Sequence, residues 1–415
     1  MTCMKTWMSD AAVIGSGPAG MMAAVTAARR GLSVTVFDPN PKTGKKLRIT
    51  GKGRCNVTND ADPRIFLENI RTNAKFFKSA LYSFPPSAAM EFFEEAGVPL
   101  KVERGGRVFP VSDSAHDVAD ALERACRSAG VRFCTERVLE LLTENGAVSG
   151  VRTDKGVFSC RSVVICTGGL SYPGTGSTGD GYAMAEKAGH CIMEPRASLI
   201  PWEGEPLCAS MQGLSLRNVT LNLYENDKLL FSEQGELLFT HFGVSGPLML
   251  SASTYMTPHG GPYRLEIDLK PGLTADKLDE RLLRDFSENV NRDFINALDA
   301  LLPKKMIGPV VALSGIGERT KVNAVTRAQR LRLRDLLKRF PIRLTKPRPI
   351  VEAIVTAGGV DVSQIHPRTM ESKLLPGLYF AGEILDIDGR TGGYNLQIAW
   401  STGHLAGSSI PVNDD

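Results

Sequence analysis

Three glycines near the beginning of the chain, Gly15, Gly17 and Gly20, have the spacing at which a backbone turn can approach a phosphate closely. The first allows a tight turn, the second lets the backbone approach a pyrophosphate, and the third lets a helix pack closely on a strand. Asp38 follows about 20 residues later, where a carboxylate can accept hydrogen bonds from ribose hydroxyls. The pattern predicts a dinucleotide site, without distinguishing FAD from NAD(P).

The surrounding segments have the periodicity that such a turn needs. Residues 11–14 form an apolar run typical of a buried strand, residues 21–30 favour a helix, and residues 32–37 form a second apolar run. A second glycine pattern at residues 174–179 does not open directly off a strand. We therefore expect it to be a glycine-rich loop of the same domain, with a second nucleotide site as the alternative.

The overall composition is that of an ordinary folded chain. Of 415 residues, 42% are hydrophobic and 23% are charged, which excludes a mostly disordered protein and a small disulfide-stabilised domain. The eight cysteines form no C-x-x-C pair and no zinc-like cluster with histidines, so we expect free thiols and no metal site. Every apolar run that approaches the length of a membrane span is interrupted by helix-breaking residues. We therefore expect a cytoplasmic protein with no membrane partner.

Positive charge is concentrated late in the chain. Residues 321–348 contain ten Lys and Arg against one acid, a local net charge of +9 in a chain whose total is +4. A solvated helix face is the favoured interpretation, and docking of an anionic ligand or a nucleic acid is the alternative. Few aromatic residues interleave with this run, which disfavours a nucleic-acid partner without excluding one.

Several longer segments carry distinctive patterns: residues 43–59, 167–182, 238–247, 356–360, 377–386 and 391–403. In this order they resemble the HI0933-like (BaiN/YhiN-type) family of NAD(P)/FAD-dependent flavoproteins, from about residue 11 to about residue 407. Two positions depart from the family pattern. Asp38 stands where many such flavoproteins carry Glu, and Lys52 interrupts the usual run of glycines.

The resemblance implies an α/β fold with a Rossmann-like FAD-binding domain of the two-dinucleotide-fold flavoprotein type. A β-barrel-like domain that carries a small helical subdomain interrupts it. The expected boundaries are residues 1–191 and 349–415 for the FAD-binding domain, 192–270 and 341–348 for the β-rich domain, and 271–340 for the helical subdomain. Within the insertion, periodicity predicts a hairpin that turns at Asn226, an amphipathic helix from Leu278 to Leu301, and a helix over about residues 319–339.

The motif and the resemblance together give the residues expected to hold FAD. They are Gly15, Gly17, Pro18, Ala19, Gly20, Asp38, Lys45, Lys46, Thr50, Gly51, Gly53, Arg54, Cys55, Asn56, Val138, Thr167, Gly168, Gly382, Glu383, Asp386, Gly393, Tyr394, Asn395, Leu396 and Gln397. By the resemblance, Val138 contacts adenine through its backbone, and Thr167 and Gly168 lie near the cofactor.

Besides Lys52, the glycine-rich segment 44–54 contains four cations, Lys45, Lys46, Arg48 and Arg54. Cations beside a flexible backbone suit a diphosphate, and the alternative is a basic surface loop. Cys55 is expected to be a packed cysteine rather than a redox thiol, because no partner cysteine lies at a useful spacing.

Gly392 and Gly393 precede a segment of helical periodicity. Free amides at the start of such a helix, with Asn395, Leu396 and Gln397 as the expected donors, would stabilise negative charge on a reduced flavin. An ordinary terminal helix is the alternative.

His241 is the first candidate for a proton donor to substrate, and Tyr172 is a weaker second. A hydrogen-bonded core histidine is the competing and more common interpretation of His241. No order of Ser, His and Asp and no pair of carboxylates points to hydrolysis.

We therefore expect an FAD-dependent oxidoreductase that passes a hydride through a non-covalently bound flavin. The expected donor is NAD(P)H, bound transiently, and the expected substrate is a small organic molecule, with enone- or steroid-like compounds included, bound where the insertion meets the flavin. The alternatives are a flavin oxidase of a small amine or alcohol, a flavin-bearing protein that binds or modifies nucleic acid, and a dehydrogenase that binds NAD alone. The sequence determines neither the substrate nor the oligomeric state.

Overall fold

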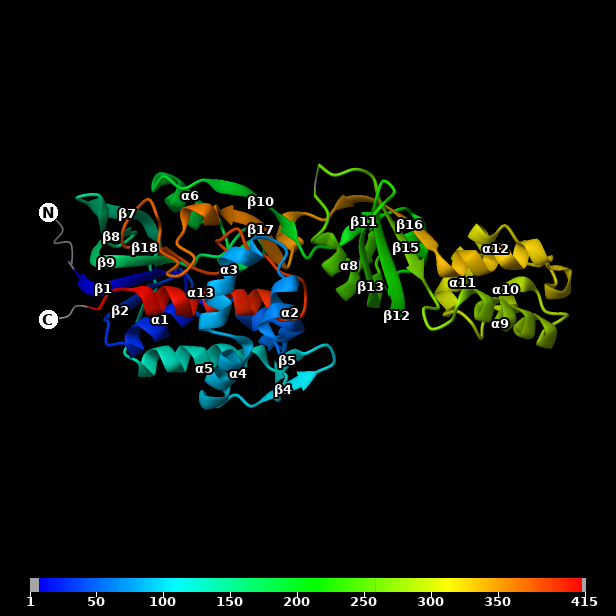
Figure 1. Ribbon diagram of the computed structural model, residues 1–415, viewed down its shortest axis with the longest axis horizontal. Coiled ribbons are helices and arrows are strands. Elements are labelled where there is room, and N and C mark those ends of the chain that lie inside the picture. Colours follow the sequence, from blue (N-terminus) through cyan, green and yellow to red (C-terminus); the bar gives the residue numbers. More distant parts are fainter. Residues whose placement is uncertain (1–6, 258, 413–415) are drawn as a thin grey trace. The chain divides into compact units, whose positions relative to one another are not determined.

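The computed structural model describes residues 7–257 and 259–412, and the chain divides into two compact units (Figure 1). Unit 1 comprises Met1–Ser198 and Ile350–Asp415, and unit 2 is the intervening segment Leu199–Pro349. The predicted α/β class with an interrupting barrel is confirmed. Unit 2 includes residues 199–270 and 341–348 of the expected β-rich domain and all of the expected helical subdomain, whereas residues 192–198 belong to unit 1. The division within unit 2 stays a prediction.

Unit 1 contains helices, a seven-stranded mixed sheet, a three-stranded sheet and a two-stranded sheet. Its strands are β1 (Trp7–Ile14), β2 (Val34–Phe37), β3 (Thr58–Asn59), β4 (Leu100–Glu103), β5 (Arg107–Pro110), β6 (Arg132–Cys134), β7 (Val138–Glu144), β8 (Ala147–Thr153), β9 (Val157–Ile165), β10 (Ile192–Ser198), β17 (Val355–Val360) and β18 (Leu378–Phe380). Its helices are α1 (Pro18–Arg29), α2 (Pro63–Glu68), α3 (Ala74–Ser83), α4 (Pro86–Glu95), α5 (Ala115–Ser128), α6 (Asp180–Lys187) and α13 (Tyr394–Ser409). No helix in the described part of the chain has the length and hydrophobicity needed to span a bilayer.

The main sheet has the order β6-β2-β1-β9-β8-β7, and β18 also pairs with β9. The pairs β6–β2, β2–β1, β1–β9 and β9–β18 are parallel, whereas β7, β8 and the beginning of β9 form an antiparallel meander. Residues 11–14 of β1, residues 162–165 of β9 and all residues of β2 and β18 are buried, as expected for parallel strands with both faces covered.

Helices α1 and α13 lie side by side against this sheet (Figure 1). Their backbones approach closely at two glycines of α13. A Cβ atom on Gly403 would lie 2.4 Å from the Ala19 carbonyl oxygen, and one on Gly407 would lie 2.3 Å from that of Ala23. Only glycine fits at these positions, since close-packed backbones leave no room for a side chain.

Unit 2 contains a closed barrel of six strands, in the order β11-β14-β13-β12-β15-β16. The strands are β11 (Trp202–Gly204), β12 (Ser215–Glu225), β13 (Lys228–Phe239), β14 (Gly243–Ser245), β15 (Tyr263–Asp268) and β16 (Phe340–Pro347). The helices are α7 (Leu207–Ser210), α8 (Pro247–Ser253), α9 (Ala275–Glu288), α10 (Phe294–Ala297), α11 (Lys304–Ser314) and α12 (Arg327–Lys338). The predicted hairpin is β12 and β13, which turn at Asn226.

Two helix boundaries within unit 2 differ from the sequence prediction. The helix expected from Leu278 to Leu301 is divided, because α9 ends at Glu288 and the Phe294 amide that begins α10 donates to the carbonyl of Thr320. The helix expected from about residue 319 begins only at Arg327. Its start is fixed by a capping box, in which the Thr326 hydroxyl accepts from the Gln329 amide and the Gln329 side chain accepts from the Thr326 amide.

The contact between α1 and α13 gives a stability prediction. Gly403→Ala forces a side chain onto the Ala19 carbonyl, so we expect it to lower the free energy of unfolding by about 2 kcal/mol or more. Gly308→Ala in α11 is the matched control, because a Cβ there meets no described atom within 4 Å. Because Pro309 follows it and offsets the usual gain from alanine in a helix, we expect it to change the free energy of unfolding by less than about 1 kcal/mol. Urea unfolding followed by circular dichroism measures both, and an unchanged midpoint for Gly403→Ala would contradict the packing.

Candidate functional site

Four parallel strands of unit 1 end level with one another. The register pairs Ile14 of β1 with Phe37 of β2 and with Ile165 of β9, and it pairs Ile165 with Phe380 of β18. The segments that follow the four strands therefore meet at one edge of the sheet, which is where open α/β sheets bind ligands.

The first glycine turn lies at this edge and is shaped by close backbone contacts. A Cβ atom on Gly15, whose φ is +105°, would lie 2.5 Å from the Cys166 carbonyl oxygen, and one on Gly20 would lie 2.0 Å from the Gly15 carbonyl oxygen. On Gly17 a Cβ would meet no described atom within 4 Å. The protein thus fills the space beside the first and third glycines and leaves the space beside the second open, as a cradle for a pyrophosphate requires.

Pro18 and Ala19 form the start of α1 after this turn. The α1 N-terminus directs amide groups and the positive end of a helix dipole toward the same edge. A Cβ atom on Gly382, which follows β18, would lie 2.7 Å from the Ala19 Cβ, so the two segments touch.

Asp38 is the first residue after β2, and its carboxylate is held by neighbours. Oδ2 accepts from the Ser16 amide at 2.8 Å and from the Ser16 hydroxyl at 2.7 Å. Oδ1 accepts from the Asn40 amide at 2.8 Å and from the Asn40 side chain at 3.0 Å. Asn40 also donates to the Thr175 carbonyl at 3.4 Å, which links Asp38 to the second glycine pattern. The pattern at residues 174–179 is thus part of a loop beside the first nucleotide turn.

Lys46 and Glu383 form an ion pair at 2.7 Å beside the end of β18. Lys46 Nζ also donates to the Ser171 hydroxyl at 2.6 Å, and that hydroxyl donates to Glu383 at 2.9 Å. Glu383 accepts in addition from the Thr356 amide at 3.0 Å. Three loops that are far apart in sequence are thereby joined at the cradle, and each of them contains predicted site residues.

The three other predicted cations of this segment divide into two groups. Lys45 is exposed, and its Nζ donates to the Asn40 side-chain oxygen at 3.4 Å, beside Asp38. Arg48 is buried and pairs with Asp120 at 2.6 Å, and Arg54 pairs with Asp113 at 2.6 Å. The structure therefore brings Lys46 to the cradle residues, whereas Arg48 and Arg54 are engaged with carboxylates.

Thr50, Gly51 and Gly53 form the tight turn between these cations. Gly51 and Gly53 have φ values of +56° and +86°, and the Cys55 amide donates to the Thr50 carbonyl at 3.1 Å. Cys55 is fully buried, and burial raises the pKa of its thiol to about 12. The thiol is therefore protonated and packed, as expected from the sequence.

The loop before α13 is held by the segment around β3. With its amide oriented to satisfy its neighbours, Asn56 accepts from the Gly393 amide at 3.0 Å through its side-chain oxygen. A Cβ atom on Gly393 would lie 2.3 Å from the Thr58 carbonyl oxygen. The Asn395 side chain accepts from the Gly389 amide at 2.9 Å, which fixes the loop that leads into the helix.

The amides at the N-terminus of α13 do not all stay free. Asn395 and Leu396 lie in the first turn, where amides have no acceptor within the helix. Gln397 donates its amide to the Gly393 carbonyl at 3.2 Å, and its buried side chain bonds Thr58 and Phe84. Of the three expected donors, the structure thus leaves Asn395 and Leu396 for a ligand. Tyr394 is buried, with its ring edge-on to a phenylalanine ring.

Buried polar groups lie behind this edge of the sheet. Burial raises the pKa of Asp386, against the hydrogen bond from Asn73 and the charge of Arg196. The Thr167 hydroxyl and the Tyr182 phenol are buried and have no hydrogen-bond partner among the described residues. Unsatisfied buried polar atoms of this kind indicate space for a ligand or ordered water.

The sequence analysis missed Asn40, Ser171 and Tyr182. Ser171 and Tyr182 lie in the segment 167–182 that carries the family resemblance, which is the signal that could have drawn attention to them. Asn40 has no such signal, because its role depends on its contacts with Asp38 and Thr175.

The remaining predicted residues lie at various places. Val138 is the buried first residue of β7, Thr167 and Gly168 follow β9, and Tyr172 is exposed in the loop that contains the second glycine pattern. His241 is exposed in unit 2, between β13 and β14, which excludes its interpretation as a core histidine.

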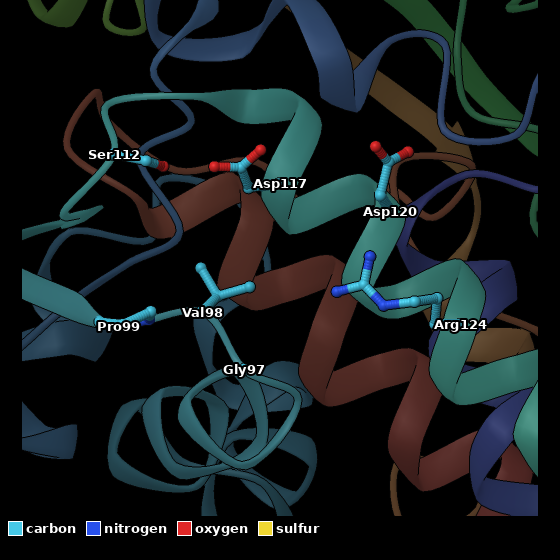
Figure 2. Close-up of a pocket in the computed structure, with 7 residues that line it drawn as sticks. All are labelled: Gly97, Val98, Pro99, Ser112, Asp117, Asp120 and Arg124. Atoms are coloured by element: carbon cyan, nitrogen blue, oxygen red, sulfur yellow. The ribbon is translucent and has the colours of Figure 1, made fainter.

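One distinct pocket of unit 1 lies outside this set. Figure 2 shows Asp117, Asp120 and Arg124 of α5 along one side and the loop at residues 97–99 along the other. Its volume is about 180 Å³, below the range typical of small-molecule sites, and none of the predicted FAD-binding residues lines it. It gives no reason to move the candidate site.

Comparison with known proteins identifies the family. Residues 9–409 match the family model described as the HI0933-like protein Rossmann domain. The chain belongs to the HI0933-like family of FAD-dependent oxidoreductases. The resemblance seen in the sequence is thereby confirmed, and FAD is the cofactor that the glycine cradle fits.

Three curated relatives align along almost their whole length. Ribosomal RNA dihydrouridine synthases of Haemophilus influenzae and Escherichia coli are 32% and 33% identical, over 97% and 95% of this chain and 98% and 96% of theirs. The 3-dehydro-bile acid delta(4,6)-reductase of Clostridium scindens is 29% identical over 96% of this chain and 98% of its own.

Solved structures show the same fold at low identity. The 3-ketosteroid-delta4-(5alpha)-dehydrogenase of Rhodococcus jostii RHA1 has a TM-score of 0.54 and 15% identity, covering 99% of this chain and 98% of its own. A flavocytochrome c3 fumarate reductase has a TM-score of 0.52 and 17% identity, covering 97% and 78%.

The open space beside Gly17 gives a binding prediction. Gly17→Ala should keep the fold but place a methyl group in the cradle, so we expect the Kd for FAD to rise about tenfold or more. Titration of apo-protein by flavin fluorescence measures the Kd, and thermal unfolding checks the fold. Gly272→Ala is the control, because a Cβ there also meets no described atom. Equal affinities for the two variants would contradict the assignment of the cradle.

The cysteines give a second prediction. Iodoacetamide reacts with the thiolate, so exposed Cys191 should be alkylated under native conditions at pH 8, whereas buried Cys55 and Cys166, whose pKa values are raised by burial, should be protected. Peptide mass mapping resolves each site, and guanidinium should release the protected ones. Cys3 lies outside the described residues. Rapid native alkylation of Cys55 would contradict its burial.

Proposed function

We propose that the protein reduces a carbon–carbon double bond conjugated to a carbonyl group, and that its substrate is a uridine base of ribosomal RNA. The observation that carries this proposal is the near full-length identity of 32–33% to two ribosomal RNA dihydrouridine synthases. Formation of dihydrouridine adds a hydride and a proton across the C5=C6 bond of uracil, which is conjugated to the C4 carbonyl.

The third relative supports the same type of reaction on another substrate. A bile acid with a 3-oxo group and a double bond at C4 is also a conjugated enone, and the relative named for its reduction is 29% identical. A small enone- or steroid-like molecule is therefore the second candidate substrate. The two candidates share the bond that is reduced and differ in size and charge.

The assigned roles of the residues follow from the geometry. Bound FAD supplies the hydride transfer, and we assign NAD(P)H as the electron donor. The glycine turn and the α1 N-terminus hold the pyrophosphate, and Asp38 holds the ribose, with its carboxylate oriented by Ser16 and Asn40. The first-turn amides of Asn395 and Leu396 favour negative charge at the isoalloxazine.

The ion pair of Lys46 and Glu383 orients both side chains at the cradle. Because each is also hydrogen-bonded to Ser171, the pair keeps the loops after β9 and β18 at a fixed separation. This arrangement supports preorganised binding rather than proton transfer.

The test uses the purified holoprotein without oxygen. NADH and NADPH are added separately, and bleaching of the flavin spectrum is recorded. Unmodified ribosomal RNA made by transcription is then added in one arm and 4-androstene-3,17-dione in the other. Nucleoside mass spectrometry detects dihydrouridine, and chromatography detects the reduced steroid.

We expect bleaching with a nicotinamide, followed by dihydrouridine in the RNA arm, and Gly17→Ala should show less of both. If only the steroid is reduced, the proposed substrate changes from RNA to a small enone- or steroid-like molecule. If a nicotinamide does not reduce the flavin and hydrogen peroxide forms in air from an amine or alcohol, both substrate candidates are contradicted and the oxidase alternative is favoured.

A further inference from the structure

The net positive charge of the chain lies in unit 2. Unit 1 has equal numbers of Lys/Arg and Asp/Glu, whereas residues 271–340 of unit 2 contain 14 Lys and Arg against nine acids. Since phosphate neutralisation dominates nucleic-acid affinity, this is the part of the chain in which RNA contacts are to be sought.

Most of the cations in the basic run 321–348 are already neutralised. Six of the ten form ion pairs with acids of unit 2, among them Arg330 with Asp279 at 2.8 Å and Lys338 with Asp268 at 2.6 Å. These six side chains are thus engaged with acids of the same unit in the structure.

Three of the other arginines are exposed along α12 and β16. Arg332 lies on α12, and Arg339 directly follows the helix seven residues later, so the two lie on the same side of it. Arg343 follows on the outer face of β16. All three are exposed, and none forms an ion pair with any described residue. We call Arg332, Arg339 and Arg343 the arginine track. Figure 1 shows α12 continuing directly into β16.

The surroundings of Arg343 point to an anionic partner. Arg343 lies directly opposite Arg264 of β15, and like charges in that position destabilise a strand pair. Arg264 has its own acids, Glu266 at 2.7 Å and Asp227 at 3.3 Å. Arg343 forms no ion pair with a described residue, because the nearby Glu205 carboxylate accepts from its backbone amide at 3.1 Å and not from its guanidinium. The guanidinium is therefore the group that an external phosphate would neutralise.

An aromatic ring stands beside this end of the track. Tyr224 of β12 pairs with Arg264, whose guanidinium lies 4.1 Å from the centre of the tyrosine ring. Tyr224, Arg264 and Arg343 thus form a row across three neighbouring strands. The tyrosine ring and the guanidinium planes offer flat surfaces on which unpaired RNA bases can stack. The exposed arginines beside them can neutralise the phosphates of the RNA backbone.

We infer that the arginine track, with the row at its barrel end, docks the sugar–phosphate backbone of the RNA substrate. This inference rests on the proposed function and assigns to unit 2 the recognition of the RNA. Along the track, seven helical residues span about 10 Å and four strand residues about 13 Å. Contacts at such intervals suit several consecutive phosphates rather than one free phosphate.

The test compares two triple variants of the holoprotein. R332E/R339E/R343E reverses the track, and K75E/K78E/K187E reverses three exposed lysines of unit 1 with the same change of net charge. The probe is fluorescein-labelled, single-stranded 30-nucleotide RNA, with its Kd measured by anisotropy from 50 to 300 mM salt. Thermal unfolding and FAD content check that both variants are intact.

We expect the track variant to bind about tenfold or more weakly at 50 mM salt, and the slope of log K against log salt to shrink by about 2. The lysine variant should stay close to the wild type. If the wild type binds RNA and the two variants bind equally, the track is overturned while the RNA-reduction proposal stands. If the wild type does not bind RNA even at 50 mM salt, both the track and an RNA substrate are overturned.

Discussion

The structure of unit 1 depends on how closely three backbone segments approach the beginning of α1. Gly20 abuts the Gly15 carbonyl, Gly382 abuts the Ala19 side chain, and Gly403 abuts the Ala19 carbonyl. Each contact is possible only without a side chain. Together they bring the first turn, the end of β18 and the last helix to the same few residues, so the site is assembled from both ends of the chain.

This constraint explains which parts of the site could be predicted from the sequence. The glycine turn and Asp38 carry a spacing that a single βαβ unit enforces, and the family resemblance placed the remaining segments in order. The contacts of Lys46 with Glu383 and of Asn40 with Thr175 join loops whose positions come from tertiary packing. A pattern of residue types indicates that a loop is basic, but it does not say whether Arg54 faces a ligand or Asp113.

The same limit appears in unit 2. Periodicity predicted the hairpin of β12 and β13, because alternation over a barrel strand is local. It also extended one helix through residues 289–293 and started another too early, since apolar residues continue across the break and only Thr326 and Gln329 mark the true start of α12. The basic run was read as one feature, whereas the structure divides it into neutralised cations that hold unit 2 together and exposed ones that do not.

The insertion of unit 2 has a simple chain geometry. Ser198, the last residue of β10, pairs with Val355 of β17 in an antiparallel ladder, and within unit 2 the Arg348 amide donates to the Pro201 carbonyl. The outgoing and returning chains therefore run next to each other on both sides of the boundary. In the topology of unit 1, Leu199–Pro349 takes the place of the loop that would connect β10 to β17 in a hairpin. Because the entropy of closing a loop grows only logarithmically with its length, unit 1 can carry an insert of this size at a cost of only a few kcal/mol more than a short turn.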